Sequence, residues 1–337
     1  MPYARISLPA STAIDSILPF AIELDRYVQH DRLIIDVPER IFFSPFVMLL
    51  LGSKISYMRK KYPGLVVIFN GWERHPYASH MGFFHMCGFE HGRHVGEAWG
   101  SQHYLPITRF DKSELIEKEF DKLEEMQDLV QRRADRISEV LSRDTLHRSA
   151  LYNVLSYCIR ELFRNVFEHA EADDLYYCAQ YWPKSGKVEL AVSDYGVGVR
   201  RALSRNPNFK FTQDKEALEY ALLPSVSGRT QEPRRSSVWF NSGYGLYMTN
   251  RLARNGGSFL IASGESAICL TPKSKTNFRT SFKGTILRVG MNVDAIGDVQ
   301  ARLAEFRREG AMLASKIAGS GNRPPSAMSM LLRRDYH

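Results

Sequence analysis

Residues 160–170 read RELFRNVFEHA, a stretch whose polar residues recur at helical spacing. Glu161, Asn165 and His169 are four residues apart, so a helix carries all three on one face. The amide oxygen of Asn165 suits a hard cation such as Mg²⁺, and the carboxylate of Glu161 can polarise a water or a hydroxyl group. Taken alone, the same pattern also fits a solvated helix face.

A second stretch, residues 188–199, reads VELAVSDYGVGV. The apolar run Val188–Val192 predicts a buried strand, and Asp194 stands where that strand ends. A carboxylate there can accept a hydrogen bond from the exocyclic amine of a purine, while Gly196 and Gly198 let backbone approach the ring. Alone, this pattern is weak, because many turns contain the same residue types.

A third stretch, residues 241–264, reads NSGYGLYMTNRLARNGGSFLIASG. Gly243 and Gly245 precede an expected helix, whose first backbone N–H groups can face an anion. A strand is expected after this helix, at Phe259–Ser263. The glycine spacing matches neither a P-loop nor a dinucleotide-binding fingerprint.

A fourth stretch, Lys283-Gly284-Thr285, leads into an expected strand at Ile286–Val289. The order of the four stretches resembles the GHKL superfamily of ATPases and kinases, over roughly residues 144–290. That superfamily includes the gyrase B-type ATPases, the heat-shock chaperone, histidine kinases and the MutL type of mismatch-repair proteins. The resemblance implies an α/β sandwich that binds ATP with Mg²⁺.

The resemblance also implies a role for each matching residue. Glu161 would be the general base, Asn165 would bind Mg²⁺, and Asp194 would bind adenine with help from Thr285. The other nucleotide-binding positions would be His169, Gly196, Gly198, Gly243, Tyr244, Gly245 and Leu246, the last four of which would supply phosphate-facing amides. Residues 200–242 would form a mobile lid over ATP, with Arg229 as a contact for the γ-phosphate.

Three functions stay open on these residues. The chain can be a Mg-ATP-dependent ATPase that acts as a regulatory switch, a serine or protein kinase of the anti-sigma-factor type, or an ATP sensor without turnover. Typical two-component autophosphorylation is disfavoured. His147 lies 18 residues before Asn165. We expect one helix to hold both residues, which places them about 27 Å apart, too far for transfer within the chain.

The first 110 residues alternate expected strands and helices. A helix is expected at Pro45–Lys61, and strands are expected at Tyr3–Leu8, Arg32–Val37 and Leu65–Phe69, with a return strand near Tyr104–Ile107. This arrangement resembles a STAS domain, the fold of anti-sigma antagonists, which implies a mixed sheet and a protein partner. In those antagonists a serine at this helix start accepts phosphate, which makes Ser44 a candidate phosphoacceptor. Its other interpretation is a helix cap.

Residues 111–143 predict a charged connector helix. Its apolar residues recur every seven positions: Ile116, Leu123, Val130 and Ile137, with Phe120, Met126, Ala134 and Leu141 on the same face. This face suggests a homodimer seam along residues 113–143 or, equally, an amphipathic helix that lies on its own domain. The expected divisions are therefore 1–110, 111–143, 144–290 and 291–337, the last with a helix at 294–316 and a tail.

Composition narrows the class of protein. The chain has 337 residues, about two domains, and its 44% hydrophobic residues can form buried cores. No apolar run is long enough to span a bilayer, and the N-terminal residues do not resemble a secretory signal. Four cysteines without a CxxC pair fit a reducing compartment. We therefore expect a cytoplasmic protein without membrane attachment.

Net charge is +8, and the excess is concentrated. Residues 271–290 hold five Lys or Arg and no acid, and residues 200–242 hold eight against four acids. Such stretches attract phosphate, and the resemblance places this charge around a nucleotide, so nucleic acid is an unlikely partner. The histidines between residues 75 and 103 lack a familiar ligand spacing, which disfavours a metal site.

Overall fold

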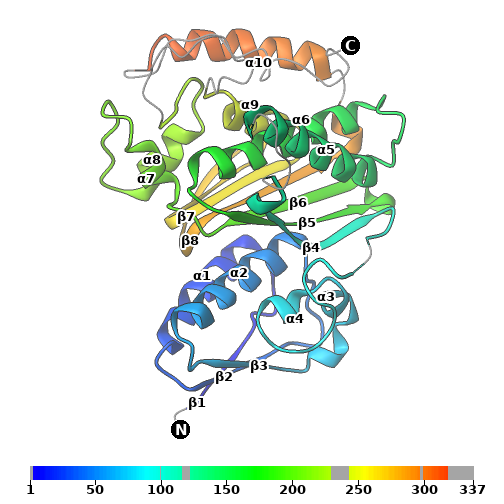
Figure 1. Ribbon diagram of the computed structural model, residues 1–337, viewed down its shortest axis with the longest axis vertical. Helices are drawn as coiled ribbons and strands as arrows, with labels where there is room; N and C mark the ends of the chain where they lie inside the picture. The colour runs from blue at the N-terminus through cyan, green and yellow to red at the C-terminus, as the bar shows by residue number, and fades with distance from the viewer. Residues whose placement is uncertain (1–2, 99, 116–121, 229–242, 297–298, 318–337) are drawn as a thin grey trace.

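Two β-sheets lie in separate layers, with one group of helices between them and another beyond the second sheet (Figure 1). This computed structural model describes residues 3–98, 100–115, 122–228, 243–296 and 299–317. The layers are, in order, a three-stranded sheet, helices, a five-stranded sheet and helices. The chain is therefore a mixed α/β protein.

The N-terminal sheet is parallel, with the strand order β1-β2-β3. Its strands are β1 (Tyr3–Ser7), β2 (Arg32–Asp36) and β3 (Val66–Asn70). Helix α1 (Ile14–Glu23) joins β1 to β2, and α2 (Pro45–Lys61) joins β2 to β3. The three strands and the second helix confirm the sequence prediction. The sheet is not mixed, because no antiparallel strand joins it among the described residues.

The second sheet is antiparallel, with the order β4-β5-β6-β8-β7. Its strands are β4 (Tyr104–Asp111), β5 (Asp174–Trp182), β6 (Lys187–Asp194), β7 (Ser258–Leu270) and β8 (Lys275–Asn292). The last two strands are much longer than the short runs expected near residues 259–263 and 286–289. As a result, the Lys-Gly-Thr stretch at 283–285 lies within β8 and not before it.

The predicted return strand near Tyr104–Ile107 belongs to the other sheet, so this prediction is wrong. β4 pairs with β5, with Arg109 opposite Tyr176. Ile107 packs in the core against the N-terminal helices, whereas Phe110 packs in the core on the opposite face of the second sheet. The local pattern predicts a strand but carries no information about its partner. The expected boundary at residue 110 therefore falls inside β4.

Helices cover both faces of the second sheet. One face carries α1 and α2; the other carries α5 (Lys122–Ser142), α6 (Ala150–His169) and α9 (Gly245–Ala253) (Figure 1). The remaining helices are α3 (Pro76–His80), α4 (Phe83–Met86), α7 (Val199–Leu203), α8 (Asp214–Ala221) and α10 (Val299–Ala314). On α10, Leu303 and Phe306 are buried against this second group, as the predicted apolar face requires. Val299 begins the helix, later than the expected start at residue 294, because residues 293–295 form a separate 3₁₀ turn.

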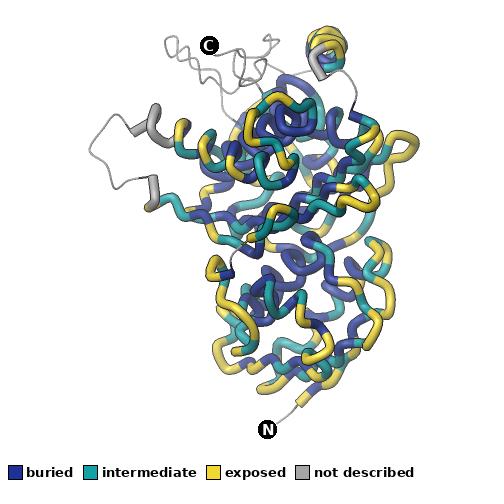
Figure 2. The backbone as a smooth tube through the Cα atoms, turned by 90° about the vertical axis from the view of Figure 1, so that its right-hand side faces the viewer, coloured by how far each residue is buried: buried dark blue, intermediate teal, exposed yellow. Residues whose placement is uncertain are grey.

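Helix α2 lies between the two sheets and is buried on almost all sides, as the dark tube in Figure 2 shows. The side chain of Ser44 accepts a hydrogen bond from Val47 N at 3.4 Å, and Pro45 occupies the first turn. This confirms the helix-cap interpretation of Ser44. The run Phe46–Leu51 is apolar without interruption because residues on every side of the helix contact core.

Helix α5 packs against α6 of the same chain. Val130, Ala134, Ile137 and Leu141 are buried there, so the described part of the heptad face lies on its own domain. This half of the face is not available for a homodimer seam. The side chains at 116, 120, 123 and 126 lie outside the described residues.

His147 lies before α6, not within it, so the expectation of one helix through His147 and Asn165 is wrong. Helix α6 begins at Ala150, and the side chain of Ser149 accepts from Tyr152 N. His147 has a positive φ of 58°, its ring stacks on Tyr152, and its Nε2 lies 2.5 Å from Glu139 Oε1. A positive φ is incompatible with a continuing helix.

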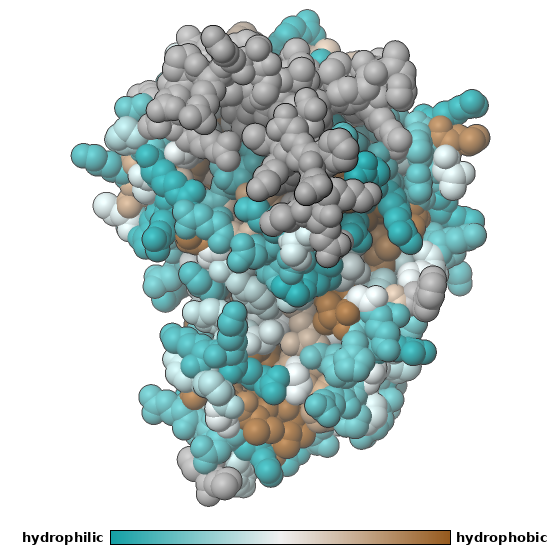
Figure 3. Space-filling view, viewed as in Figure 1, coloured by the Kyte–Doolittle hydropathy of each residue, from teal (hydrophilic) through white to brown (hydrophobic). Residues whose placement is uncertain are grey.

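Among the described residues, no helix combines the length and apolar character that crossing a bilayer requires. Figure 3 shows small apolar patches on the N-terminal half, separated by hydrophilic residues. Tyr3, Phe42 and Val66 are the most exposed large apolar residues of that half.

Because the second sheet and α1 and α2 share one core, we expect the two sheets to unfold together. Phe282 of β8 is 4% exposed in that core. Phe282→Ala is expected to lower the free energy of unfolding by about 3–5 kcal/mol. Hydrogen exchange at increasing denaturant would follow β2 and β6 separately. The same substitution at the exposed Phe42 is the control, and separate midpoints for the two strands would contradict a shared core.

Candidate functional site

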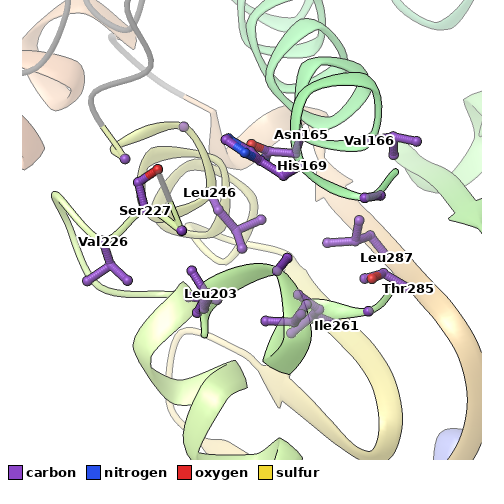
Figure 4. A pocket seen from close by; sticks show the side chains of 18 of the residues that line it. Asn165, Val166, His169, Leu203, Val226, Ser227, Leu246, Ile261, Thr285 and Leu287 are labelled. Atoms are coloured by element: carbon purple, nitrogen blue, oxygen red, sulfur yellow. The ribbon is translucent and has the colours of Figure 1, made fainter. Parts of the chain in front are cut away.

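A pocket lies between α6, α9, the end of β6 and the segment around α7 (Figure 4). Eight residues that the sequence singles out line it: Asn165, His169, Asp194, Gly198, Gly243, Gly245, Leu246 and Thr285. They come from all four stretches of the sequence analysis.

Asp194 is buried at the wall of this pocket, where it ends β6 opposite Thr285 of β8. The backbone N–H of Gly196 donates to Asp194 Oδ1 at 2.8 Å. Burial raises the pKa of Asp194 to about 7, although the backbone N–H groups of Gly196 and Thr285 and the charge of Lys283 oppose the shift. The carboxyl group can therefore change protonation near neutral pH.

The backbone beside Asp194 requires glycine at position 284. Gly284 has a φ of +83°, and a Cβ there would lie 2.1 Å from the carbonyl oxygen of Asp194. The hydroxyl of Ser263 donates to the Gly284 carbonyl at 2.7 Å and accepts from Val199 N at 3.0 Å. These contacts tie the start of α7 to the strands that form the pocket wall.

Asn165 and His169 reach the pocket from the last turns of α6. Figure 4 shows them on one side of the pocket, with Leu203 and Ile261 on the opposite side. Two of the three residues predicted from the RELFRNVFEHA stretch therefore share one cavity with Asp194.

The second glycine stretch forms the beginning of α9. Gly243 has a φ of +74°, Tyr244 precedes the helix with its side chain buried, and Gly245 is the first helical residue. Gly243, Gly245 and Leu246 line the pocket. The first N–H groups of a helix lack partners within the helix, so this end favours an anion.

Glu161 is 3% exposed and does not line the pocket in the described structure. Its Oε1 lies 3.4 Å from Arg160 Nε and 3.3 Å from Arg164 Nη1, and Arg164 Nε lies 3.0 Å from Glu168 Oε1. Burial alone would lower the pKa of Arg164, but Glu161 and Glu168 raise it above its ordinary value. The predicted general base is therefore one member of a buried ion network.

The expected lid, residues 200–242, is described up to Gly228. Leu203, Val226 and Ser227 line the pocket. Arg229, the expected γ-phosphate contact, lies outside the described residues. Arg200 pairs with Asp214, and Arg205 pairs with Glu171, so these basic residues contact acids instead of the pocket.

Ser44, the candidate phosphoacceptor, lies on the other side of the second sheet. It precedes α2, and the next backbone N–H group along the chain, that of Phe46, donates to Glu189 Oε1 near the start of β6 at 2.9 Å. The pocket is on the α6 side, at the opposite end of β6. This placement does not favour phosphate transfer to Ser44 within one chain.

The sequence does not reveal the apolar walls of the pocket or the polar contacts between β6 and α2. Val166, Ala170, Leu203, Ile261 and Leu287 line the pocket, but in the sequence they look like ordinary core residues. Pairs such as Ser53 and Ser193 leave no sequence signal, because they depend on how α2 packs on the sheet.

In the part of the chain that the structure describes, no group of three or more His, Cys, Asp or Glu could hold a metal ion. The ring of His91 stacks on Trp72, and His80 Nε2 lies 2.9 Å from the hydroxyl of Tyr104. Mg²⁺ bound with a nucleotide takes most ligands from phosphate and water, so one amide oxygen such as that of Asn165 fits this need.

The sequence matches no known protein family model, and no curated protein is similar enough to count as a relative. The assignment of a function therefore depends on the geometry of the pocket and on the motifs.

The protonation of Asp194 leads to a prediction about stability. In the unfolded chain the pKa of its carboxyl group is the ordinary value of 3.8, whereas in the folded chain the pKa is about 7. Between these values the folded state holds more protons, so its stability falls as pH rises. Relative to the wild type, the free energy of unfolding of the neutral Asp194→Asn variant is expected to rise by about 4 kcal/mol between pH 4 and pH 8. Chemical denaturation of both proteins across this range measures the difference between their free energies of unfolding. A difference that does not change with pH would contradict the raised pKa of the buried Asp194.

Proposed function

We propose that the chain is a regulatory module that binds ATP with Mg²⁺ in this pocket and passes the nucleotide state to its N-terminal half. The main support is convergence: the four stretches that resemble the GHKL superfamily are far apart in the chain, yet their residues line one cavity. The N-terminal half, with its parallel sheet and helices, is the expected partner-binding part.

The adenine would lie beside Asp194. The carboxyl group of Asp194 can accept a hydrogen bond from the exocyclic amine, and Thr285 lies opposite it in the ladder. Ile261, Leu287 and Val166 give this part of the pocket apolar walls that suit a purine ring.

The phosphates would face the beginning of α9. Gly243, Gly245 and Leu246 line the pocket there, and the helix end favours negative charge. Asn165 would ligate Mg²⁺, and His169, one turn further along α6, would contact the nucleotide beside it. When bound, the cation would neutralise phosphate charge.

Turnover is the second candidate, either ATP hydrolysis or phosphate transfer to a protein hydroxyl group. It is favoured by the position of Glu161 against Gly245, a residue of the pocket lining. It is disfavoured by the two guanidinium groups at Glu161 Oε1, because a general base must reach the proton that it removes. We therefore propose binding and signalling as the function.

A route for the signal runs through the strand that carries Asp194. On the side away from the pocket, the hydroxyl groups of Ser193 and Ser53 lie 2.9 Å apart, and the Tyr195 hydroxyl donates to the Ser53 carbonyl at 3.2 Å. Tyr57, one turn further along α2, stacks on Tyr195. A ligand bound to Asp194 would thus act on α2 through the neighbouring residues Ser193 and Tyr195.

A protein partner would bind the outer face of the N-terminal sheet. Tyr3 and Val66 are exposed there on either side of Arg32, in one row across the three strands. None of the helices in the described part of the chain covers this face in Figure 1. Parallel sheets usually bury both faces, which makes this open face a suitable partner surface.

The proposed nucleotide site predicts the effect of two substitutions on ATP affinity. Asp194→Asn at pH 8 is expected to weaken ATP binding at least about tenfold, and Asn165→Ala to weaken binding of Mg-ATP more than that of Mg-free ATP. Calorimetric titration measures both affinities. The exposed Asp173→Asn and Asn277→Ala are matched controls. No binding of ATP by the wild type would reject the proposed function.

The proposed route predicts a change in α2. ATP is expected to lower hydrogen exchange around residues 53–57, because Ser193 and Tyr195 contact that part of the helix. Removing both hydroxyl groups with Ser53→Ala/Ser193→Ala is expected to reduce this effect and leave ATP affinity within about twofold. Unchanged exchange in α2 of the ATP-bound wild type would exclude this route.

A further inference from the structure

Glu161 is held in place by groups on its own helix. Arg160 Nε and Arg164 Nη1 lie 3.4 and 3.3 Å from its Oε1, and all three side chains are at most 4% exposed. Arg160 Nη1 also donates to Gln131 Oε1 of α5 at 3.2 Å, so the network reaches the neighbouring helix. Such a closed set of charges leaves little freedom for the carboxylate to turn toward the pocket.

The other oxygen of Glu161 points at the beginning of α9. A Cβ on Gly245 would lie 2.2 Å from Glu161 Oε2 and 3.2 Å from its Cδ. Glycine at position 245 is therefore required by the close approach of this carboxylate, and its φ is not in the left-handed region. The contact places a negative charge at the N-terminal end of a nine-residue helix, where it is favourable.

We propose that Glu161 is a positioning residue: Arg160 and Arg164 fix its carboxylate against Gly245, and this contact holds the first turn of α9 where its N–H groups face the phosphates. The inference rests on the proposed function for its ligand. It assigns to Glu161 a role in phosphate binding through α9, in place of the general-base role that the resemblance implies.

The first test compares ligands that share the adenine part and differ in phosphates. In Glu161→Gln, the affinity for ATP and ADP is expected to fall about tenfold or more, while that for adenosine stays within about twofold. Adenosine depends on Asp194 and not on α9. A variant that is simply less well folded would lose both. Unchanged ATP affinity combined with loss of phosphate release would overturn the proposal and make Glu161 a general base.

A second variant approaches the same contact from the other side. Gly245→Ala places a methyl group against Glu161 Oε2 and is expected to cause the same selective loss of phosphate-bearing ligands. Gly64→Ala is the matched control, because a Cβ at Gly64 meets no atom within 4 Å. Full retention of ATP affinity in Gly245→Ala would count against the contact.

Hydrogen exchange of the nucleotide-free protein separates this inference from the proposed function. Glu161→Gln is expected to raise exchange in α9 about tenfold and to leave β6 unchanged. If the wild type binds neither adenosine nor ATP, the proposed function fails, and exchange in α9 alone then decides the role of Glu161. Equal exchange in α9 of wild type and variant would reject the positioning role.

Discussion

The pairing of β6 with β8 is the constraint on which both the site and its connections depend. It places Asp194 opposite Thr285 and brings Gly284 against the backbone of Asp194. Because side chains alternate along a strand, Val192 and Asp194 face α6, whereas Ala191 and Ser193 face α2. The end of β6 therefore forms part of the pocket wall with one face and contacts the helices between the two sheets with the other.

Because β6 packs against helices on both faces, the sequence predicts individual helices and strands better than it predicts which of them pack together. The cap at Ser44 and the apolar residues after it predict α2 correctly, because capping and periodicity are local. The same local information predicts β4 as a strand but assigns it to the wrong sheet. Ile107 and Phe110 are apolar in either arrangement, and only the packing of the whole chain shows that they belong to opposite faces.

The candidate site was predictable where backbone geometry or polar chemistry needs a particular residue. Asp194, three of the glycines (198, 243 and 245) and two residues of the α6 face, Asn165 and His169, stand out for that reason, and the structure brings them to one pocket. Gly196 and Glu161 stand out equally but are not part of the pocket lining. The sequence predicts only part of the ion network at Glu161. The spacing of Glu161, Arg164 and Glu168 suggests helical ion pairs, but the sequence does not say that they are buried, and burial is what turns an exposed pair into a fixed support.

The scarcity of basic side chains in the described pocket lining makes the position of α9 important for phosphate binding. None of the described residues that line the pocket is Lys or Arg. Arg200 and Arg205, which the sequence places in a basic stretch beside the nucleotide, are paired with Asp214 and Glu171. Among the described groups, the N–H groups of α9 would therefore be the main partners of a bound triphosphate. The cation that accompanies the nucleotide would neutralise much of the remaining phosphate charge. Helix N–H groups attract an anion only while they point at it, since the effect is confined to the first turn. On the proposed function, a buried carboxylate that fixes the position of that turn would govern phosphate affinity without touching the ligand.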